Sequence, residues 1–134
     1  MAFRVVVDTS AVLAAVLSEP AATGVVAATR GATILAAPSL PWEIGNALVA
    51  LVRRGMAGAA EAQRGWDVFL RVPLRYVEID GSAAIRLAVQ TGLHAYDAYV
   101  LEAARASRAP LLSLDRRQCR AARTLGIAVV EVAG

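Results

Sequence analysis

The stretch VVVDTSAVLAAVLSEP, from Val5 to Pro20, decides the fold class of this chain. Its β-branched residues predict a short buried strand over Phe3–Val7, and the alanine- and leucine-rich residues after them predict a helix over Thr9–Leu17. One carboxylate, Asp8, stands where the strand ends and the helix begins. A strand that leads directly into a helix is typical of α/β folds with parallel strands. The stretch therefore predicts such a fold, with an acid at the carboxyl end of its first strand.

The alternation of strand and helix continues along the whole chain. Further strands are predicted over residues 32–37, 74–79, 110–114 and 127–132, and further helices over residues 20–30, 42–54, 57–71, 80–90, 94–107 and 115–125. No linker, internal repeat or low-complexity tract interrupts this pattern. We therefore expect one α/β domain over residues 1–134, with a mainly parallel central sheet between helices in three α/β/α layers.

Composition excludes several classes of protein. Hydrophobic residues make up 57% of the chain, but alanine dominates them and no window predicts a membrane span or a signal peptide. We therefore expect a soluble cytoplasmic protein without membrane contact. The single cysteine, Cys119, rules out a disulfide framework and a cysteine zinc cluster, and the single histidine, His94, is more consistent with a structural or capping role than with a metal site.

All fourteen basic residues are arginines. Because the chain has no lysine, the sequence argues against a P-loop, a Schiff-base enzyme and a response-regulator receiver, each of which uses one. The net charge of +3 is mild. It suits a nucleic-acid or acidic partner but establishes neither.

Four acids from distant parts of the sequence are expected at one edge of the sheet. In an open parallel sheet, ligands gather beyond the carboxyl ends of the strands. Asp8 and Asp115 follow the first and fourth predicted strands, and Glu43 begins the helix after the second. Asp97 begins a helix that runs antiparallel to the fourth strand, so it points to the same edge. These four acids are the candidate catalytic residues.

The same edge holds acids that need no catalytic role. An acid between a strand and a helix often only caps the helix, and for Asp8 and Asp115 taken singly the two interpretations have equal weight. Asp80 is best explained as such a cap, and Glu131 also ends a strand. Glu102 is expected, less clearly, at a solvated position. Glu43 and Asp97 differ because both lie in apolar settings, where an uncompensated acid is costly.

Crowded carboxylates repel one another, and a divalent cation removes that penalty. An all-oxygen ligand set, without cysteine or several histidines, suits Mg²⁺ or Mn²⁺ better than zinc. The chemistry that follows from such a site is metal-assisted hydrolysis of phosphodiesters.

These residues resemble a known family, the PIN-domain ribonucleases of the VapC toxin type. The opening stretch is similar to that family's first strand and aspartate, and APSLPWEIGNALVALVRRG, from Ala37 to Gly55, to its second block. The segment GLHAYDAYVLEAARASRAPLLSLDRRQCRAARTLGIAVVEV, from Gly92 to Val132, is similar to its last two blocks and closing strand. Residues 57–76 carry no family signal.

The resemblance implies a PIN-like domain that acts as a Mg²⁺- or Mn²⁺-dependent endoribonuclease. It also implies a cognate VapB-like antitoxin protein and a homodimer. Its catalytic and metal-binding acids would be Asp8, Glu43, Asp97 and Asp115. Residues that orient those acids would be Thr9, Ser10, Asn46 and Ser113, although Thr9 would serve equally well as a helix cap. Residues that contact RNA phosphates would be Arg116 and Arg117, for which solvated helix positions are an equal alternative.

The early helices carry more apolar residues than one small sheet requires, so we expect part of this surface to meet a partner. The residues concerned are Leu13, Leu17, Val25, Val26, Leu48 and Leu51.

Two other functions are compatible with such a fold. A PIN-like domain that binds RNA or protein without cleavage is one, and intact acids argue against it. A phosphohydrolase with an aspartate nucleophile is the other. Haloacid-dehalogenase types need a second aspartate where Ser10 stands, and a lysine that this chain lacks.

Overall fold

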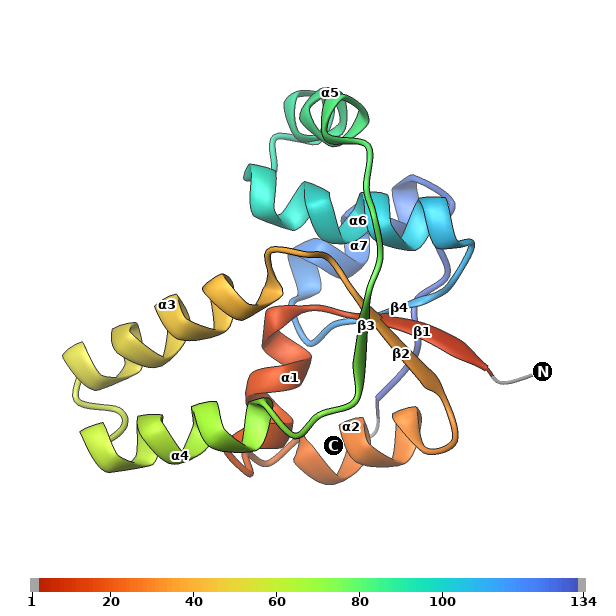
Figure 1. Ribbon diagram of the computed structural model, residues 1–134. Coiled ribbons are helices and arrows are strands. Elements are labelled where there is room, and N and C mark those ends of the chain that lie inside the picture. The colour runs from red at the N-terminus through yellow and green to blue at the C-terminus, as the bar shows by residue number, and fades with distance from the viewer. Residues whose placement is uncertain (1–2, 133–134) are drawn as a thin grey trace.

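A central parallel sheet organises the fold (Figure 1). The structure, a computed structural model, describes residues 3–132. Within them the strands are β1 (Arg4–Val7), β2 (Thr33–Ala36), β3 (Leu74–Tyr76) and β4 (Leu111–Leu112), in the spatial order β3-β2-β1-β4. The helices are α1 (Thr9–Val16), α2 (Ala22–Thr29), α3 (Leu40–Arg53), α4 (Ala59–Phe69), α5 (Gly81–Thr91), α6 (Ala95–Ser107) and α7 (Arg116–Thr124).

Side chains of the sheet alternate between two cores, as the two-residue period of a strand requires. Val5 and Val7 pack with apolar residues of α1 to α4, whereas Val6 packs with those of α5 to α7. In Figure 1 these two groups of helices cover opposite faces of the sheet. The parallel sheet and the three α/β/α layers predicted from the sequence are confirmed.

The predicted fifth strand, over residues 127–132, is wrong in extent. Only Val129 forms a bridge to the sheet, opposite Leu111. Two backbone hydrogen bonds hold the segment there, from the Leu111 N–H to Ala128 and from the Val130 N–H to Leu111, each 2.8 Å long. Its neighbour β4 is only two residues long, so it offers too short an edge for a longer ladder.

The third strand is also shorter than predicted and stops at Tyr76. Beyond the hydrogen bond from the Val77 N–H to Ala36, of 3.0 Å, the chain leaves the sheet. Val77 and Ile79 instead pack against the core beneath α5 and α6. Their apolar alternation reflects burial there and not strand pairing.

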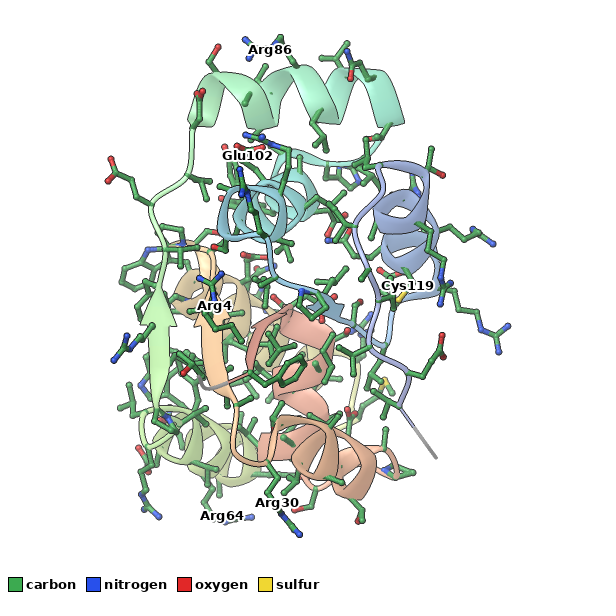
Figure 2. All side chains as sticks on the ribbon, turned by 90° about the vertical axis from the view of Figure 1, so that its right-hand side faces the viewer. Arg4, Arg30, Arg64, Arg86, Glu102 and Cys119 are labelled. Atoms are coloured by element: carbon green, nitrogen blue, oxygen red, sulfur yellow. The ribbon has the colours of Figure 1, made fainter. Side chains whose placement is uncertain are left out.

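Glu102 is buried, not solvated as the sequence suggested. It is 1% exposed on α6 and accepts hydrogen bonds of 2.8 and 2.5 Å from Nε and Nη2 of Arg105. Figure 2 shows Glu102 beneath α5. The two residues stand three positions apart on one helix, so the charge pair forms locally and compensates for the burial.

The expected excess of apolar surface on the early helices is mostly consumed by the protein's own core. Val25 and Leu48 are buried, Leu13, Leu17 and Leu51 are partly buried, and Val26 is exposed. No helix among residues 3–132 is long and apolar enough to cross a membrane.

Candidate active site

Asp8 lies at the carboxyl end of β1 and is only 7% exposed. Its Oδ1 accepts hydrogen bonds from the Ala11 N–H, 3.1 Å away, and from Ser10 Oγ, 2.6 Å away. Its Oδ2 accepts a hydrogen bond from Ser113 Oγ. Asp8, and not Thr9, is therefore the N-cap of α1. Three of roughly four acceptor positions on this carboxylate are filled, which leaves one without a described partner.

Two serine hydroxyls tie Asp8 to the chain beyond β4. Ser10 Oγ accepts a hydrogen bond of 2.9 Å from the Leu114 N–H. Ser113 Oγ accepts one of 3.0 Å from the Asp115 N–H. Since both hydroxyls also donate to Asp8, they fix its carboxylate relative to the segment that carries Asp115.

Glu43 is held by two other hydroxyls. Thr9 Oγ1 donates to its Oε1 over 3.2 Å, and Ser39 Oγ donates to its Oε2 over 2.7 Å. The first bond joins the start of α1 to the first turn of α3. Sequence reasoning missed Ser39, although a serine four residues before a glutamate at a helix start is a recognisable signal. Asn46, expected to hold this carboxylate, is exposed, and the described contacts do not pair it with Glu43.

Asp97 and Asp115 begin α6 and α7, and Gln118 links them. Asp115 Oδ1 caps α7 by accepting from the Arg117 and Gln118 N–H groups at 2.9 and 3.3 Å. The buried amide of Gln118 donates to the Asp97 carbonyl over 3.0 Å. Gln118 was not foreseen. A polar residue four positions before the buried Ala122, on the inner face of the helix, was the available signal.

Asp80 behaves as predicted. Its side chain caps α5 by accepting a hydrogen bond of 3.2 Å from the Ala83 N–H. It therefore shares the capping role of Asp8 and Asp115, but its only described side-chain bond is that cap.

The charges of the four acids act on one another. Burial raises the pKa of Asp8 above its ordinary value, its hydrogen bonds oppose this, and the charge of Asp115 raises it further. Burial likewise raises the pKa of Glu43, the Ser39 and Thr9 hydroxyls lower it, and the charges of Asp97 and Asp8 raise it. The pKa of Asp97 is also raised, first by burial and then by Asp115, against the lowering effect of His94 and Arg117. Each of the four acids therefore lies close enough to at least one other to affect its pKa.

These acids supply only oxygen ligands, a donor set that suits Mg²⁺ or Mn²⁺. Within residues 3–132, however, no three acidic, histidine or cysteine side chains are arranged as a ready ligand set for one ion. Mg²⁺ typically uses one or two carboxylates and keeps several waters, so it does not need a complete protein cage. The Asp97 carboxylate and Asp115 Oδ2 accept no hydrogen bond from the described residues, so both have free lone pairs. The donor set therefore fits such an ion.

The two arginines proposed for RNA contact differ in their surroundings. Arg117 Nη2 donates to the Gly92 carbonyl over 2.9 Å and so ties α7 to the connection between α5 and α6. Arg116 is exposed and lines a groove beside α7.

Comparisons with known proteins identify chains of similar fold. Similar solved structures include PAE2754 from Pyrobaculum aerophilum, with 28% sequence identity, a TM-score of 0.69, and coverage of 90% of this chain and 87% of that one. Another is VapBC2 from Rickettsia felis, bound to a DNA fragment from its promoter, with 14% identity, a TM-score of 0.69, and coverage of 98% and 100%. No curated protein sequence matches the chain at a significant level. The PIN domain matches residues 5–124, so the chain belongs to the PIN domain family.

Proposed function

We propose that this protein is a Mg²⁺- or Mn²⁺-dependent endoribonuclease and the toxin of a type II toxin-antitoxin pair. One observation supports the proposal: Asp8, Glu43, Asp97 and Asp115 come from distant parts of a PIN-family chain, and hydrogen bonds through Thr9, Ser113 and Gln118 link the segments that carry them. Such an arrangement of acids is destabilising unless a cation compensates for it. We place the activity in the cytoplasm as part of the proposal, because its RNA substrate lies there.

Each of the four acids would have its own role at the metal site. A bound divalent ion supplies Lewis-acid stabilisation of a phosphodiester and a water of lowered pKa. Asp97 and Asp115 would contribute the freest carboxylate oxygens to the ion. Asp8 would hold a fixed position because Ser10 and Ser113 donate to it. Glu43, set by Thr9 and Ser39, would orient a water or complete the ligand set.

Cleavage of RNA should require the ion. Purified protein treated with EDTA should lose activity, and an excess of Mg²⁺ or Mn²⁺ should restore it, because only the ion allows the acids and a phosphate to approach. Gel analysis of a labelled RNA measures this. Undiminished cleavage by protein shown to be metal-free would refute the metal role. Metal-loaded, folded protein that binds RNA but never cleaves it would favour the alternative, a binding module.

Ser113→Ala should lower Mn²⁺ affinity and cleavage about 10- to 100-fold, the usual effect of losing a residue that orients a metal ligand. The change removes the donor to Asp8 Oδ2 and the acceptor of the Asp115 N–H. Calorimetric titration and cleavage kinetics measure the two effects. Ser82→Ala is the matched control, since that hydroxyl accepts a hydrogen bond from Arg86 on α5 instead. Equal results for the two variants would remove Ser113 from the site.

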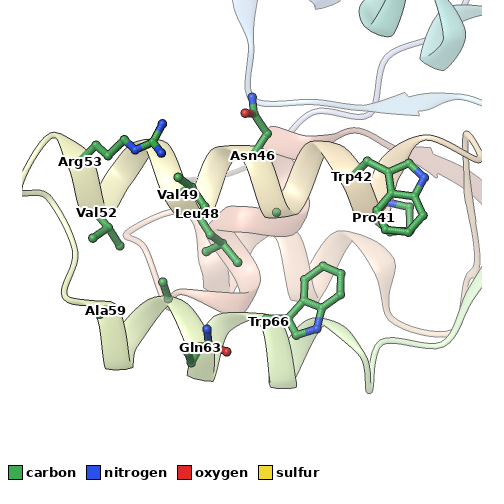
Figure 3. A pocket seen from close by; sticks show the side chains of 12 residues that line it. Pro41, Trp42, Asn46, Leu48, Val49, Val52, Arg53, Ala59, Gln63 and Trp66 are labelled. Atoms are coloured by element: carbon green, nitrogen blue, oxygen red, sulfur yellow. The ribbon is translucent and has the colours of Figure 1, made fainter.

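An antitoxin partner and a homodimer belong to the same proposal. The resolved VapBC2 neighbour shares the fold, and apolar surface between α3 and α4 offers room for a partner. This groove has a volume of about 670 Å³, and Figure 3 shows Trp66 pointing from α4 toward α3 beside the exposed Trp42.

Expression of the protein alone should arrest growth, and co-expression of a protein encoded beside it should relieve the arrest. Growth curves with verified soluble expression measure this, and Asp115→Asn serves as the inactive control. Normal growth with active, metal-competent protein would contradict the toxin function. A monomer in light scattering at micromolar concentration would contradict the homodimer.

A further inference from the structure

We propose that a groove along α7 binds the phosphate backbone of single-stranded RNA next to the acidic site. The proposal rests on the proposed nuclease function and names where the strand lies. The groove has a volume of about 570 Å³ and lies between α7 and residues 129–132. Arg116, Arg120 and Arg123 line it.

The three arginines form a row because of their spacing. They stand at positions i, i+4 and i+7 of one helix, so they lie on one face, about one helical turn apart. Figure 2 shows Cys119, which lies between two of them in sequence and also lines the groove, on α7 at the side of the molecule. A linear row of cations complements a strand that carries one negative charge per nucleotide.

The groove adjoins the acidic site through one residue, Ser113. Ser113 lines it, and the same hydroxyl donates to Asp8 Oδ2 and accepts the Asp115 N–H at 3.0 Å. A strand whose reacting phosphate lies at the acids could therefore continue along α7 without leaving the surface.

Two of the three arginines lack a charge partner within the described residues. Within the described residues Arg116 and Arg120 form no ion pair, and only Arg123 does, with Glu131 at 2.9 Å. Like charges one turn apart repel, and a cation in the first turn, such as Arg116, opposes the helix dipole. A polyanion relieves both costs. RNA is favoured over an acidic protein because the row leads to the acids that would bind the reacting phosphate.

Glu131 predicts an effect of opposite sign. It lines the same groove, is 86% exposed and would repel phosphates. Its neutralisation should therefore tighten RNA binding, while neutralisation of the arginines should weaken it. Arg117 is excluded from the row because it bonds Gly92 instead.

The test is a binding titration of fluorescein-labelled single-stranded RNA with the full-length protein in EDTA, followed by anisotropy over a range of KCl concentrations. The Arg116→Gln/Arg120→Gln double variant should reduce the slope of log K against log [KCl] by about 1.4, or about 0.7 for each lost phosphate contact. It should also weaken binding several-fold at the lowest salt. Glu131→Gln should tighten it. Arg64→Gln and Glu61→Gln, both on exposed residues of α4, are the matched controls and should leave the slope unchanged.

An unchanged slope in the double variant would overturn the proposal, as would an equal effect of Arg64→Gln. A third result would also overturn it: a double variant that binds RNA normally but whose toxicity the co-expressed partner no longer relieves. That result would assign the groove to a protein. The test is separable from the nuclease function. Arginine-dependent binding without cleavage would refute the nuclease and keep the groove, whereas cleavage with an unchanged slope would do the reverse.

Discussion

Asp97→Asn and Asp115→Asn are each expected to lower the rate of RNA cleavage by more than about 100-fold. Loss of a residue that merely orients a ligand costs about 10- to 100-fold, so loss of the ligand itself should cost more. Asp97 is the cleaner test because the described residues give its carboxylate no hydrogen bond, so the change to an amide should disturb little else. Single-turnover cleavage at saturating Mn²⁺ measures the effect.

Asp80→Asn is the matched control for Asp115→Asn. Both aspartates cap a helix, Asp80 through the Ala83 N–H and Asp115 through the Arg117 and Gln118 N–H groups. Asparagine retains most of this capping ability. A cleavage defect in Asp80→Asn as large as that in Asp115→Asn would mean that capping, and not metal binding, explains the effect.

Metal-free Asp8→Asn is expected to be more stable than the metal-free wild type at neutral pH. Burial and the charge of Asp115 disfavour the charged form of Asp8 in the folded state, and asparagine removes that charge. The amide can still accept from Ala11 and Ser10, and its N–H group can donate to Ser113 if that hydroxyl rotates. Thermal melts in EDTA measure the difference. A variant less stable than Asp80→Asn would show that the hydrogen bonds of Asp8 outweigh its repulsion.

The pH dependence follows from the same shift. The folded-state pKa of Asp8 is raised above its ordinary value of 3.8, so the folded protein binds this proton more tightly than the unfolded chain. The metal-free wild type should therefore lose stability as pH rises from 3.8 through the raised pKa. Above that pKa the penalty is complete. Asp8→Asn should lose less stability over this pH range. If the free energy of unfolding of both proteins fell equally with pH, the raised pKa would not belong to Asp8.

Local sequence predicts most of this fold, and two features depend on tertiary packing instead. The valine run before Asp8 and the breaks at glycine and proline predict the sheet, the layers and the acids at one edge, because local propensity and burial agree there. The final segment failed as a strand because its pairing depends on the length of β4, a tertiary property. Glu102 was misjudged because its burial depends on the packing of α5 over α6.

Within the site, residue type predicted the acids but not the bonds between them. Ser113 and Ser10 were foreseen as orienting residues, and the structure gives both a contact with Asp8. Asn46 was placed near Glu43 by its spacing of three residues, but Thr9 and Ser39 donate to that carboxylate instead. Gln118 escaped notice because its role is a contact with Asp97 from another helix.

The central claim is that Asp8 helps to hold a divalent cation, and metal-induced stabilisation tests it most directly. Thermal melts of the wild type, Asp8→Asn and Asp80→Asn should be compared in EDTA and in Mn²⁺. The Mn²⁺ concentration is the same for all three, a hundredfold above the dissociation constant of the wild type. The wild type and Asp80→Asn should each gain about 2.7 kcal/mol, roughly 10 °C in melting temperature, and Asp8→Asn should gain much less. If Asp8→Asn gains as much as the other two, Asp8 is only a helix cap and the claim that it helps to hold the cation is wrong.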